Sequence, residues 1–318
     1  MTAPNGYSAL HHSAGWIQRL DVGRVRLRGN DRRSYLHGLL TNDVESLAPG
    51  QGVYAALLTA QGRMISDMHV YELGDAVLLT VPLPLTSAIR AHLDQFVFSE
   101  DVQVEDVTDA TVQIGIYGPS AADAVESLRT TETNLVLPSD DFGIAGFEVI
   151  VERESRDRVI ASVDAAGARA VNMETLDVVR VESGVPQFLV DMTETTIPLE
   201  AGIEKRAISM TKGCYPGQEV IVRVLHRGGG RVARKLVGIV LAYETELPPA
   251  HAGVYSGDRE IGTLTSVVAS PRLGRPLALG YVHRDFIAAG TAVEVESPKG
   301  HRVPGEIRSL PATESGAP

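Results

Sequence analysis

The stretch Lys212-Gly213-Cys214-Tyr215-Pro216-Gly217-Gln218-Glu219 holds the only cysteine among the 318 residues of the chain. Pro216 suits the first position of a helix, where its missing N–H would be unpaired in any case. Cys214 would then lie beside the positive end of a helix dipole and close to Lys212, and both favour the thiolate over the thiol. The octet therefore predicts a reactive, catalytic Cys214 with Lys212 as its activating neighbour. The alternative is a small hydrophobic residue buried in a turn.

Basic residues gather around this octet, although the chain as a whole is acidic. Residues 205–235 contain one acid, Glu219, and eight basic residues, whereas the full chain has 29 basic and 40 acidic residues. The eight are Lys205, Arg206, Lys212, Arg223, Arg227, Arg231, Arg234 and Lys235. Such a basic stretch predicts a site for an anion, such as phosphate, a carboxylate or a polyanionic tail. The alternative is a solvated loop whose arginines pair with acids elsewhere in the fold.

The octet resembles the signature Lys-Gly-Cys-Tyr-x-Gly-Gln-Glu of the YgfZ family, folate-binding relatives of the glycine-cleavage T-protein, an aminomethyltransferase. The motif is long and unusual, and further similar segments extend over roughly residues 16–310. The resemblance implies tetrahydrofolate, or a folate derivative, as the cofactor. It also implies support for the assembly or repair of iron–sulfur proteins, including enzymes that modify tRNA, through transient contact with those client proteins.

The order of predicted strands and helices indicates an α+β fold in three parts. Residues 16–110 predict a strand, a helix, a three-strand meander and a second helix, and residues 111–230 again interleave strands with helices. Both patterns favour modules of the split βαβ (ferredoxin-like) type. Residues 231–311 alternate short strands with glycine turns, which is typical of a small β-barrel, and we expect a disordered tail at 312–318. The T-protein resemblance implies that the two modules form a folate-binding core.

One carboxylate follows the glycine turn Gln61-Gly62-Arg63 in a predicted strand. The matching T-protein segment is similar but carries two adjacent aspartates, one of them catalytic, whereas this chain has Ser66 and Asp67. The resemblance implies a catalytic role for Asp67, and the missing second carboxylate places aminomethyl transfer in doubt. An exposed strand residue without a role in catalysis is an equal alternative on the sequence alone.

A second carboxylate lies near the end of a helix that Asn172 is expected to cap and Gly184 to end. Glu182 follows apolar residues by three and four positions, so it borders the inward face, where Arg180 cannot be its partner on the same face. Arg-x-Glu-x-Gly resembles the T-protein segment whose glutamate binds folate, and a carboxylate is suited to accept two N–H bonds from a pterin. A structural ion pair is the alternative. The expected folate-binding residues are Glu182, Arg180, Tyr215, Gln218, Arg223 and Arg227, with the basic side chains attracting the glutamate tail.

Composition sets the remaining expectations. No apolar run approaches the ~18 residues of a membrane span, and residues 1–15 lack the parts of a signal peptide. A single cysteine excludes an internal disulfide framework and favours the cytoplasm. The nine histidines lack metal-ligand spacing, and His37, His69, His92 and His226 are isolated, so we expect no metal site. A net charge of −11 argues against DNA binding, and we expect a monomer.

Three functions differ in the residues on which they depend. The first is a folate-binding accessory protein for iron–sulfur enzymes, in which Cys214 contacts a client transiently, because a cluster needs about four thiolates for stable ligation. The second is a folate-dependent one-carbon transferase, which needs acid–base groups at the reacting carbon. The third, an RNA-binding module, rests on the basic stretch alone, which lacks an aromatic strip for stacking. We favour them in this order.

Overall fold

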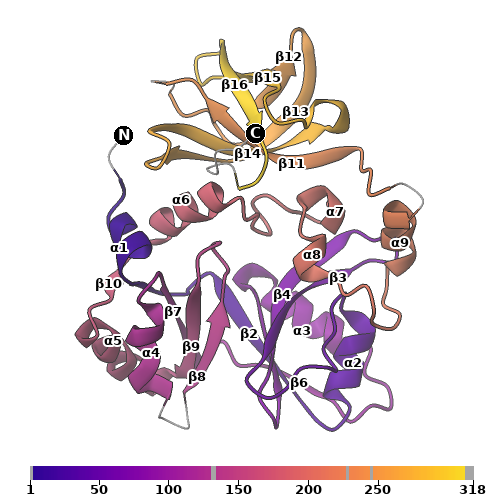
Figure 1. Cartoon of the computed structure of the whole chain (residues 1–318). Helices are drawn as coiled ribbons and strands as arrows, with labels where there is room; N and C mark the ends of the chain where they lie inside the picture. The colour runs from indigo at the N-terminus through magenta and orange to yellow at the C-terminus, as the bar shows by residue number, and fades with distance from the viewer. Residues whose placement is uncertain (1–2, 130–133, 227–228, 244–245, 312–318) are drawn as a thin grey trace.

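The computed structural model of the chain describes residues 3–129, 134–226, 229–243 and 246–311. Two α+β modules lie side by side, and a β-barrel covers one end of the pair (Figure 1). Helix α6 (Met173–Ser183) lies between the barrel and the modules. The mixed α+β fold with a C-terminal barrel is therefore the one that the sequence predicts.

The first module is a five-stranded antiparallel sheet in the order β3-β4-β5-β2-β6. Its elements are β2 (Val22–Arg28), α2 (Arg32–Leu39), β3 (Gly52–Leu58), β4 (Met64–Glu72), β5 (Val77–Pro82), the 3-10 helix η1 (Leu83–Leu85), α3 (Thr86–Asp94) and β6 (Gln103–Asp106). Val25 and Leu27 of β2 pack in one hydrophobic core with Leu36 of α2 and Ile89 of α3. Strands β3 to β5 form the predicted meander. Without β5, the remaining elements have the split βαβ arrangement expected from the sequence.

The second module is a five-stranded sheet in the order β10-β1-β7-β9-β8. Its elements are α1 (Tyr7–His12), β1 (Gly15–Gln18), β7 (Thr111–Tyr117), α4 (Ala121–Arg129), β8 (Leu135–Ser139), β9 (Gly146–Glu152), the 3-10 helix η2 (Arg153–Ser155), α5 (Arg156–Ala165) and β10 (Arg169–Ala170). Strand β1 inserts between β7 and β10, so it adds one strand to a split βαβ module. The boundary expected at residue 16 therefore does not separate the modules, because β1 precedes the first module in sequence but belongs to the second sheet.

The C-terminal part is a closed barrel of six strands in the order β11-β14-β13-β12-β15-β16. The elements are β11 (Arg234–Leu241), β12 (Gly253–Ser256), β13 (Arg259–Ser270), β14 (Arg275–His283), the 3-10 helix η3 (Arg284–Phe286), β15 (Ala292–Glu296) and β16 (Arg302–Arg308). Val178 and Val181 of α6 share a hydrophobic cluster with Leu236 and Leu277 of the barrel. This packing fixes α6, and with it the side chains that α6 presents to the modules, against the barrel.

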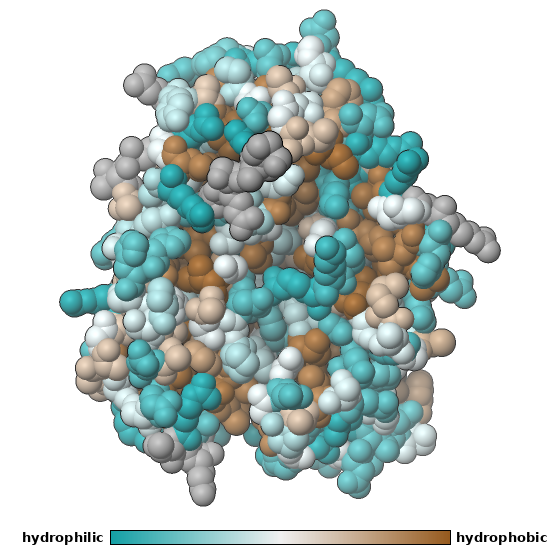
Figure 2. Space-filling view, in the orientation of Figure 1, coloured by the Kyte–Doolittle hydropathy of each residue, from teal (hydrophilic) through white to brown (hydrophobic). Residues whose placement is uncertain are grey.

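Between α6 and the barrel, the chain crosses the first module through α7 (Pro198–Ala201), α8 (Glu204–Ala207) and α9 (Gln218–His226). Leu199 and Ile221 of this segment share a hydrophobic cluster with Ala56 and Met64 of the first module. Figure 2 shows brown hydrophobic patches in the band between the barrel and the modules, on a face that is otherwise largely polar. Over the described ranges, no helix is long and apolar enough to cross a membrane.

Candidate functional site

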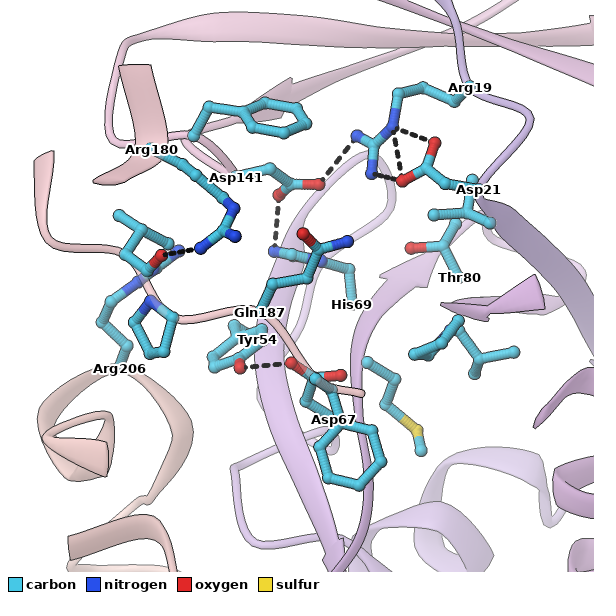
Figure 3. A pocket seen from close by; sticks show the side chains of 18 residues that line it. Arg19, Asp21, Tyr54, Asp67, His69, Thr80, Asp141, Arg180, Gln187 and Arg206 are labelled. Carbon is cyan, nitrogen blue, oxygen red and sulfur yellow. Dashed lines mark hydrogen bonds and ion pairs between the residues drawn. The ribbon is translucent and has the colours of Figure 1, made fainter. Parts of the chain in front are cut away.

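A cavity of about 110 Å³ lies where the two modules meet α6 and the segment that follows it (Figure 3). Its polar lining comes from β3, β4, the β1–β2 connection, the loop after β8, α6 and α8, and includes Tyr54, Asp67, His69, Asp141, Arg19, Arg180, Gln187 and Arg206. Apolar side chains, among them Val81, Phe142 and Phe188, complete the walls. Titratable groups that converge from distant parts of a chain onto one concave site are typical of a ligand-binding or catalytic centre.

Strand β4 presents Asp67 to the cavity because side chains alternate between the two faces of a strand. Tyr54, on the neighbouring strand β3, donates its phenolic hydrogen to Asp67 Oδ2 over 2.7 Å. Burial raises the pKa of the Asp67 carboxyl, although the Tyr54 hydrogen bond and the nearby His69 act in the opposite direction. Burial, reinforced by Asp67, also raises the pKa of Tyr54 well above its usual range, so Tyr54 stays a donor. The pair thus forms a carboxyl group suited to holding a proton.

His69 lies two residues further along β4, on the same face as Asp67. Its Nε2 is 3.0 Å from Asp141 Oδ1, and Asp141 Oδ2 accepts a hydrogen bond from Arg19 over 3.1 Å. Although burial alone would raise the pKa of Asp141, the charges of His69 and Arg19 lower it to about 2. Asp141 is therefore a carboxylate throughout the physiological pH range. It links a strand of the first module to the connection that leads from β1 to β2.

Arg19 is a buried hub behind this site. Its guanidinium donates to Asp21, to Tyr117 over 2.9 Å and to Glu148 over 3.0 Å, in addition to Asp141. Burial raises the pKa of Glu148, against the opposing charge of Arg19. Removing one partner of such a buried charge destabilises the fold by several kcal/mol, because the charge is left without compensation. Arg19 is thereby fixed in place, and it fixes Asp141 in turn.

Two more arginines border the cavity. The guanidinium of Arg180 donates from Nη1 to Asp191 over 2.7 Å and from Nη2 to Ser266 of the barrel over 2.9 Å. Arg206 of α8 donates to Asp140 over 2.7 Å, and its Cζ lies 5.0 Å from the centre of the Tyr54 ring. Arg180 therefore ties the cavity wall to the barrel, while Arg206 joins the first and second modules.

Comparison with known proteins agrees with this architecture. Residues 4–137 match the family described as the GCVT N-terminal domain, and residues 234–313 match the glycine cleavage T-protein C-terminal barrel domain. An N-terminal and a C-terminal region of the chain therefore each match a domain family of the glycine cleavage T-protein. The T-protein part of the expected resemblance is thereby confirmed.

Similar proteins cover most of this T-protein-like chain. An aminomethyltransferase from Nostoc sp. is 29% identical, and the aligned region covers 91% of this chain and 82% of that protein. An aminomethyltransferase from Saccharopolyspora erythraea is 26% identical and covers 96% of this chain and 88% of its own. The crystal structure of the glycine cleavage system aminomethyltransferase T from Bartonella henselae superposes with a TM-score of 0.86 at 21% identity, over 96% of this chain and 88% of that one. That superposition shows a shared fold.

The residue that replaces the second T-protein aspartate faces away from the cavity. Ser66 is completely buried, and its hydroxyl donates to the backbone oxygen of Asp67 over 2.8 Å. Because adjacent side chains on a strand point to opposite faces, Ser66 and Asp67 do not share the site. The position of the missing carboxylate therefore faces away from the cavity, and Asp67 is the residue of this pair that lines it.

Glu182 of this T-protein-like chain is buried away from the cavity, on the side of α6 opposite to Arg180. Its Oε2 accepts from Tyr7 over 2.6 Å, and its Oε1 accepts from Ser270 Oγ over 2.5 Å and from the Arg272 backbone N–H over 3.2 Å. Glu182 thus joins α1, α6 and the barrel, in the manner of the structural alternative. Of the residues expected to bind folate that the structure describes, Arg180 alone lines the cavity.

The octet packs against the outside of the first module. Lys212 Nζ donates to the backbone oxygens of His37 and Leu40, the latter over 2.5 Å, at the end of α2. Burial lowers the pKa of Lys212 to about 8. The structure therefore engages the Lys212 ammonium with carbonyl groups at a helix C-terminus, where a cation is favourable.

The helix expected at Pro216 begins two residues later, at Gln218. Gly217 has a φ of 82°, a left-handed conformation that interrupts a right-handed helix. Cys214 is exposed and precedes the helix start by four residues, with this turn between them. Tyr215 is buried in the cluster beneath, whereas Gln218 opens α9 outside the cavity lining.

Over its described residues, the basic stretch does not form one continuous site. Arg206 lines the cavity, whereas Arg234 pairs with Glu200 over 3.0 Å. Arg223 is exposed on α9, outside the cavity lining. Arg227 and the expected tail at 312–318 lie outside the described residues.

Sequence reasoning missed most of the cavity lining. Tyr54, Asp141 and Arg19 lie on segments that are far apart in sequence, and no local pattern joins them. The position of His69 did carry a signal, because two residues along a strand from Asp67 is the same face. As an isolated histidine, His69 was considered only as a metal ligand and not as a neighbour of Asp67 on the same strand face.

Proposed function

We propose that the protein binds tetrahydrofolate in the central cavity and transfers a one-carbon unit, with Asp67 as the group that takes and returns a proton. The observation that carries this proposal is the position of Asp67, which faces the cavity with a raised pKa and a fixed donor, Tyr54, on Oδ2. A carboxyl group whose pKa is raised by burial is suited to general acid–base catalysis.

The cavity lining fits a reduced pterin. Apolar side chains such as Phe142, Phe188 and Val81 form its walls, while carboxyl groups offer acceptors for the N–H groups of the ring. Asp141 Oδ1 is buried and has no hydrogen-bond partner among the described residues, although His69 is close enough for an ion pair. Asp67 and Asp141 would therefore hold the polar edge of the ring between these walls. Arg206 would lie near carboxylates of the tail.

Tetrahydrofolate, when bound, supplies the nitrogen that carries the one-carbon unit. The chain's own contribution is to hold that nitrogen near Asp67, to exclude water with the apolar walls and to move one proton. Because Tyr54 donates to Oδ2, Oδ1 of Asp67 is the oxygen left for the proton. Support also comes from the relatives, which are named aminomethyltransferases.

A titration of the purified protein with tetrahydrofolate, followed by calorimetry, tests binding. Repeating the incubation with the other glycine-cleavage components and measuring the one-carbon product tests transfer. We expect saturable binding and detectable transfer. Binding without transfer under any of these conditions contradicts the enzymatic proposal and leaves the accessory function, whereas the absence of folate binding contradicts both.

Glu182 provides a prediction that separates a structural role from folate binding. The Glu182 carboxylate accepts hydrogen bonds from Tyr7, Ser270 and the backbone N–H of Arg272. In Glu182→Gln, an amide NH₂ group replaces one carboxylate oxygen and faces these donors without being able to accept from them. We expect the free energy of unfolding to fall by about 1–3 kcal/mol, with folate affinity preserved. Urea denaturation and calorimetry measure the two quantities. Glu174→Gln, an exposed change on the same helix, is the control. Lost folate affinity at unchanged stability would return Glu182 to the folate site.

A second function rests on a separate observation, the exposed thiol of Cys214. The resemblance of the octet to the YgfZ signature supports an accessory role toward iron–sulfur enzymes, including those that modify tRNA. In that role the thiol would contact a client protein transiently from the outer surface of the first module. Lys212 and Tyr215 would hold the octet in place, because the Lys212 Nζ lies 5.2 Å from the centre of the Tyr215 ring and binds the end of α2.

Cys214→Ser tests this second function. The substitution keeps the size of the exposed side chain, so we expect folding, folate binding and one-carbon transfer to match the unchanged protein. If the accessory function is correct, cells carrying Cys214→Ser lose activity of the dependent iron–sulfur enzymes, as measured by tRNA methylthiolation. Full complementation by Cys214→Ser would leave the octet with its structural role alone. Ser209→Ala, a change on the same segment, is the control.

A further inference from the structure

The side chain of His69 is held in a way that one-carbon transfer through Asp67 alone does not explain. Its Nε2 faces Asp141 at 3.0 Å. Its ring lies 5.1 Å from the ring of Tyr54, tilted by 46°, and 6.0 Å from the ring of Tyr71, nearly parallel to it. The ring therefore has one nitrogen within ion-pair distance of a carboxylate and two aromatic neighbours that restrict its rotation.

The partner of His69 is a permanent carboxylate. Asp141 is in contact with Arg19, which is itself held by three further groups. A carboxylate that accepts the hydrogen of one imidazole nitrogen leaves the other nitrogen with a free electron pair. The carboxylate–imidazole pair of hydrolytic enzymes uses this arrangement to present a base to a substrate. In His69, the nitrogen left over is Nδ1.

The charged and titratable groups around His69 come from every element packed against it. They are Asp67 on β4, Tyr54 on β3, Tyr71 on β4, Asp140 and Asp141 in the loop after β8, Arg19 after β1 and Arg206 on α8. Arg206 is paired with Asp140, and Arg19 with Asp141. Both carboxylates are thus neutralised by arginines, which disfavours a cation shared among His69, Asp140 and Asp141 even though their ligand atoms lie within 4.8 Å.

We infer that His69 is a second proton-transfer group of the cavity, oriented by Asp141, and that it acts on the substrate that exchanges the one-carbon unit with folate. This inference rests on the proposed function and adds one residue to it. That substrate carries an amine or a thiol, because its reacting atom must release a proton to His69 as it forms a bond to carbon. His69 and Asp67 lie on the same face of β4, so both reach one reacting centre.

The proton and electron balance follows from these positions. In transfer away from folate, Nδ1 of His69 takes the proton of the amine or thiol, whose electron pair forms the new bond to carbon. The bond from carbon to the folate nitrogen breaks, its electron pair remains on that nitrogen, and Asp67 supplies the proton. In the opposite direction, Asp67 takes the proton and His69 returns one. Two groups whose environments differ in this way are typical of paired acid–base catalysis.

His69→Gln tests the inference by activity, because the amide of Gln donates a hydrogen bond near the position of Nε2 but provides no base. We expect folate affinity to persist and transfer to fall by about 10²-fold or more. Asp141→Asn should give a smaller loss, since it leaves the imidazole in place without its carboxylate. His92→Gln, on α3 and away from the cavity, is the matched control. Unchanged transfer in His69→Gln overturns the inference and leaves a structural ion pair.

A second measurement does not depend on transfer or on the folding of a variant. Diethyl pyrocarbonate acylates an unprotonated imidazole nitrogen, and peptide mapping of the unchanged protein reports each histidine. We expect His69 to react, and 5-formyltetrahydrofolate to protect His69 while the exposed His226 continues to react. If folate does not bind, the proposed function fails, but a reactive His69 still identifies a free base at the cavity. An unreactive His69 overturns the inference in either case, as does reaction that bound folate leaves unchanged.

Discussion

In Asp67→Asn, we expect one-carbon transfer to fall by about 10²-fold or more, the scale of a lost general acid–base group. Asparagine keeps the shape of the side chain and an oxygen for the hydrogen bond from Tyr54, but it neither takes nor gives the proton. Because the pKa of Asp67 is raised by burial, the loss of the charged form relieves a desolvation cost. Folding and folate binding should therefore survive. Product formation with glycine-cleavage components and calorimetric titration measure the two properties.

The control for this prediction is Asp75→Asn, in the exposed turn between β4 and β5. It removes the same charge from the same module without touching the cavity. Transfer that persists in Asp67→Asn would exclude Asp67 as the proton-transfer group. Loss of both binding and transfer would assign Asp67 to folate recognition instead.

Gly217→Ala is expected to lower the free energy of unfolding by about 2–4 kcal/mol. Gly217 has a φ of 82°, and an added Cβ would lie 2.4 Å from the backbone oxygen of Thr59 and 2.9 Å from the Cα of Gly62. Both are backbone atoms of the turn between β3 and β4, so they have little freedom to move away. The change therefore combines conformational strain with overlap, and it separates the octet from the first module.

Gly274→Ala isolates the conformational part of that effect. Gly274 also has a left-handed φ, of 66°, but no atom in the described part of the chain lies within 4 Å of its ideal Cβ position. We expect this control to cost about 1 kcal/mol. Thermal and urea denaturation of both variants give the comparison. Equal losses would show that the contact between the octet and the β3–β4 turn adds nothing to stability.

Local patterns in the sequence predict much of the fold. The meander ending at β5, the cap of α6 by Asn172 and its termination at Gly184 follow from turn residues and periodicity, and each is present. The barrel follows from its short strands and glycine turns. These features depend on residues that are close in sequence, so they can be recognised in a single sequence.

Features that depend on distant partners were not predictable in the same way. The direction of Glu182 is an example, because helical spacing shows that it is inward-facing but does not distinguish the cavity from the contact with Tyr7 and Ser270. The pairing of His69 with Asp141 is another, since it joins two modules. The octet marks the family resemblance, but its conformation shows that a conspicuous motif need not lie at the cavity.

The insertion of β1 into the second sheet has a consequence for synthesis on the ribosome. Residues of β1 emerge before those of the first module, yet their partners are β7 and β10, and the latter ends at Ala170. The first module, from β2 to β6, lies wholly between β1 and both of its partner strands in sequence and contains its own core. Because domains fold as units from the N-terminal side during synthesis, this module completes its sheet while the leading strand is still unpaired. Strand β1 is thus made before the first module but can join its own sheet only after that module is complete.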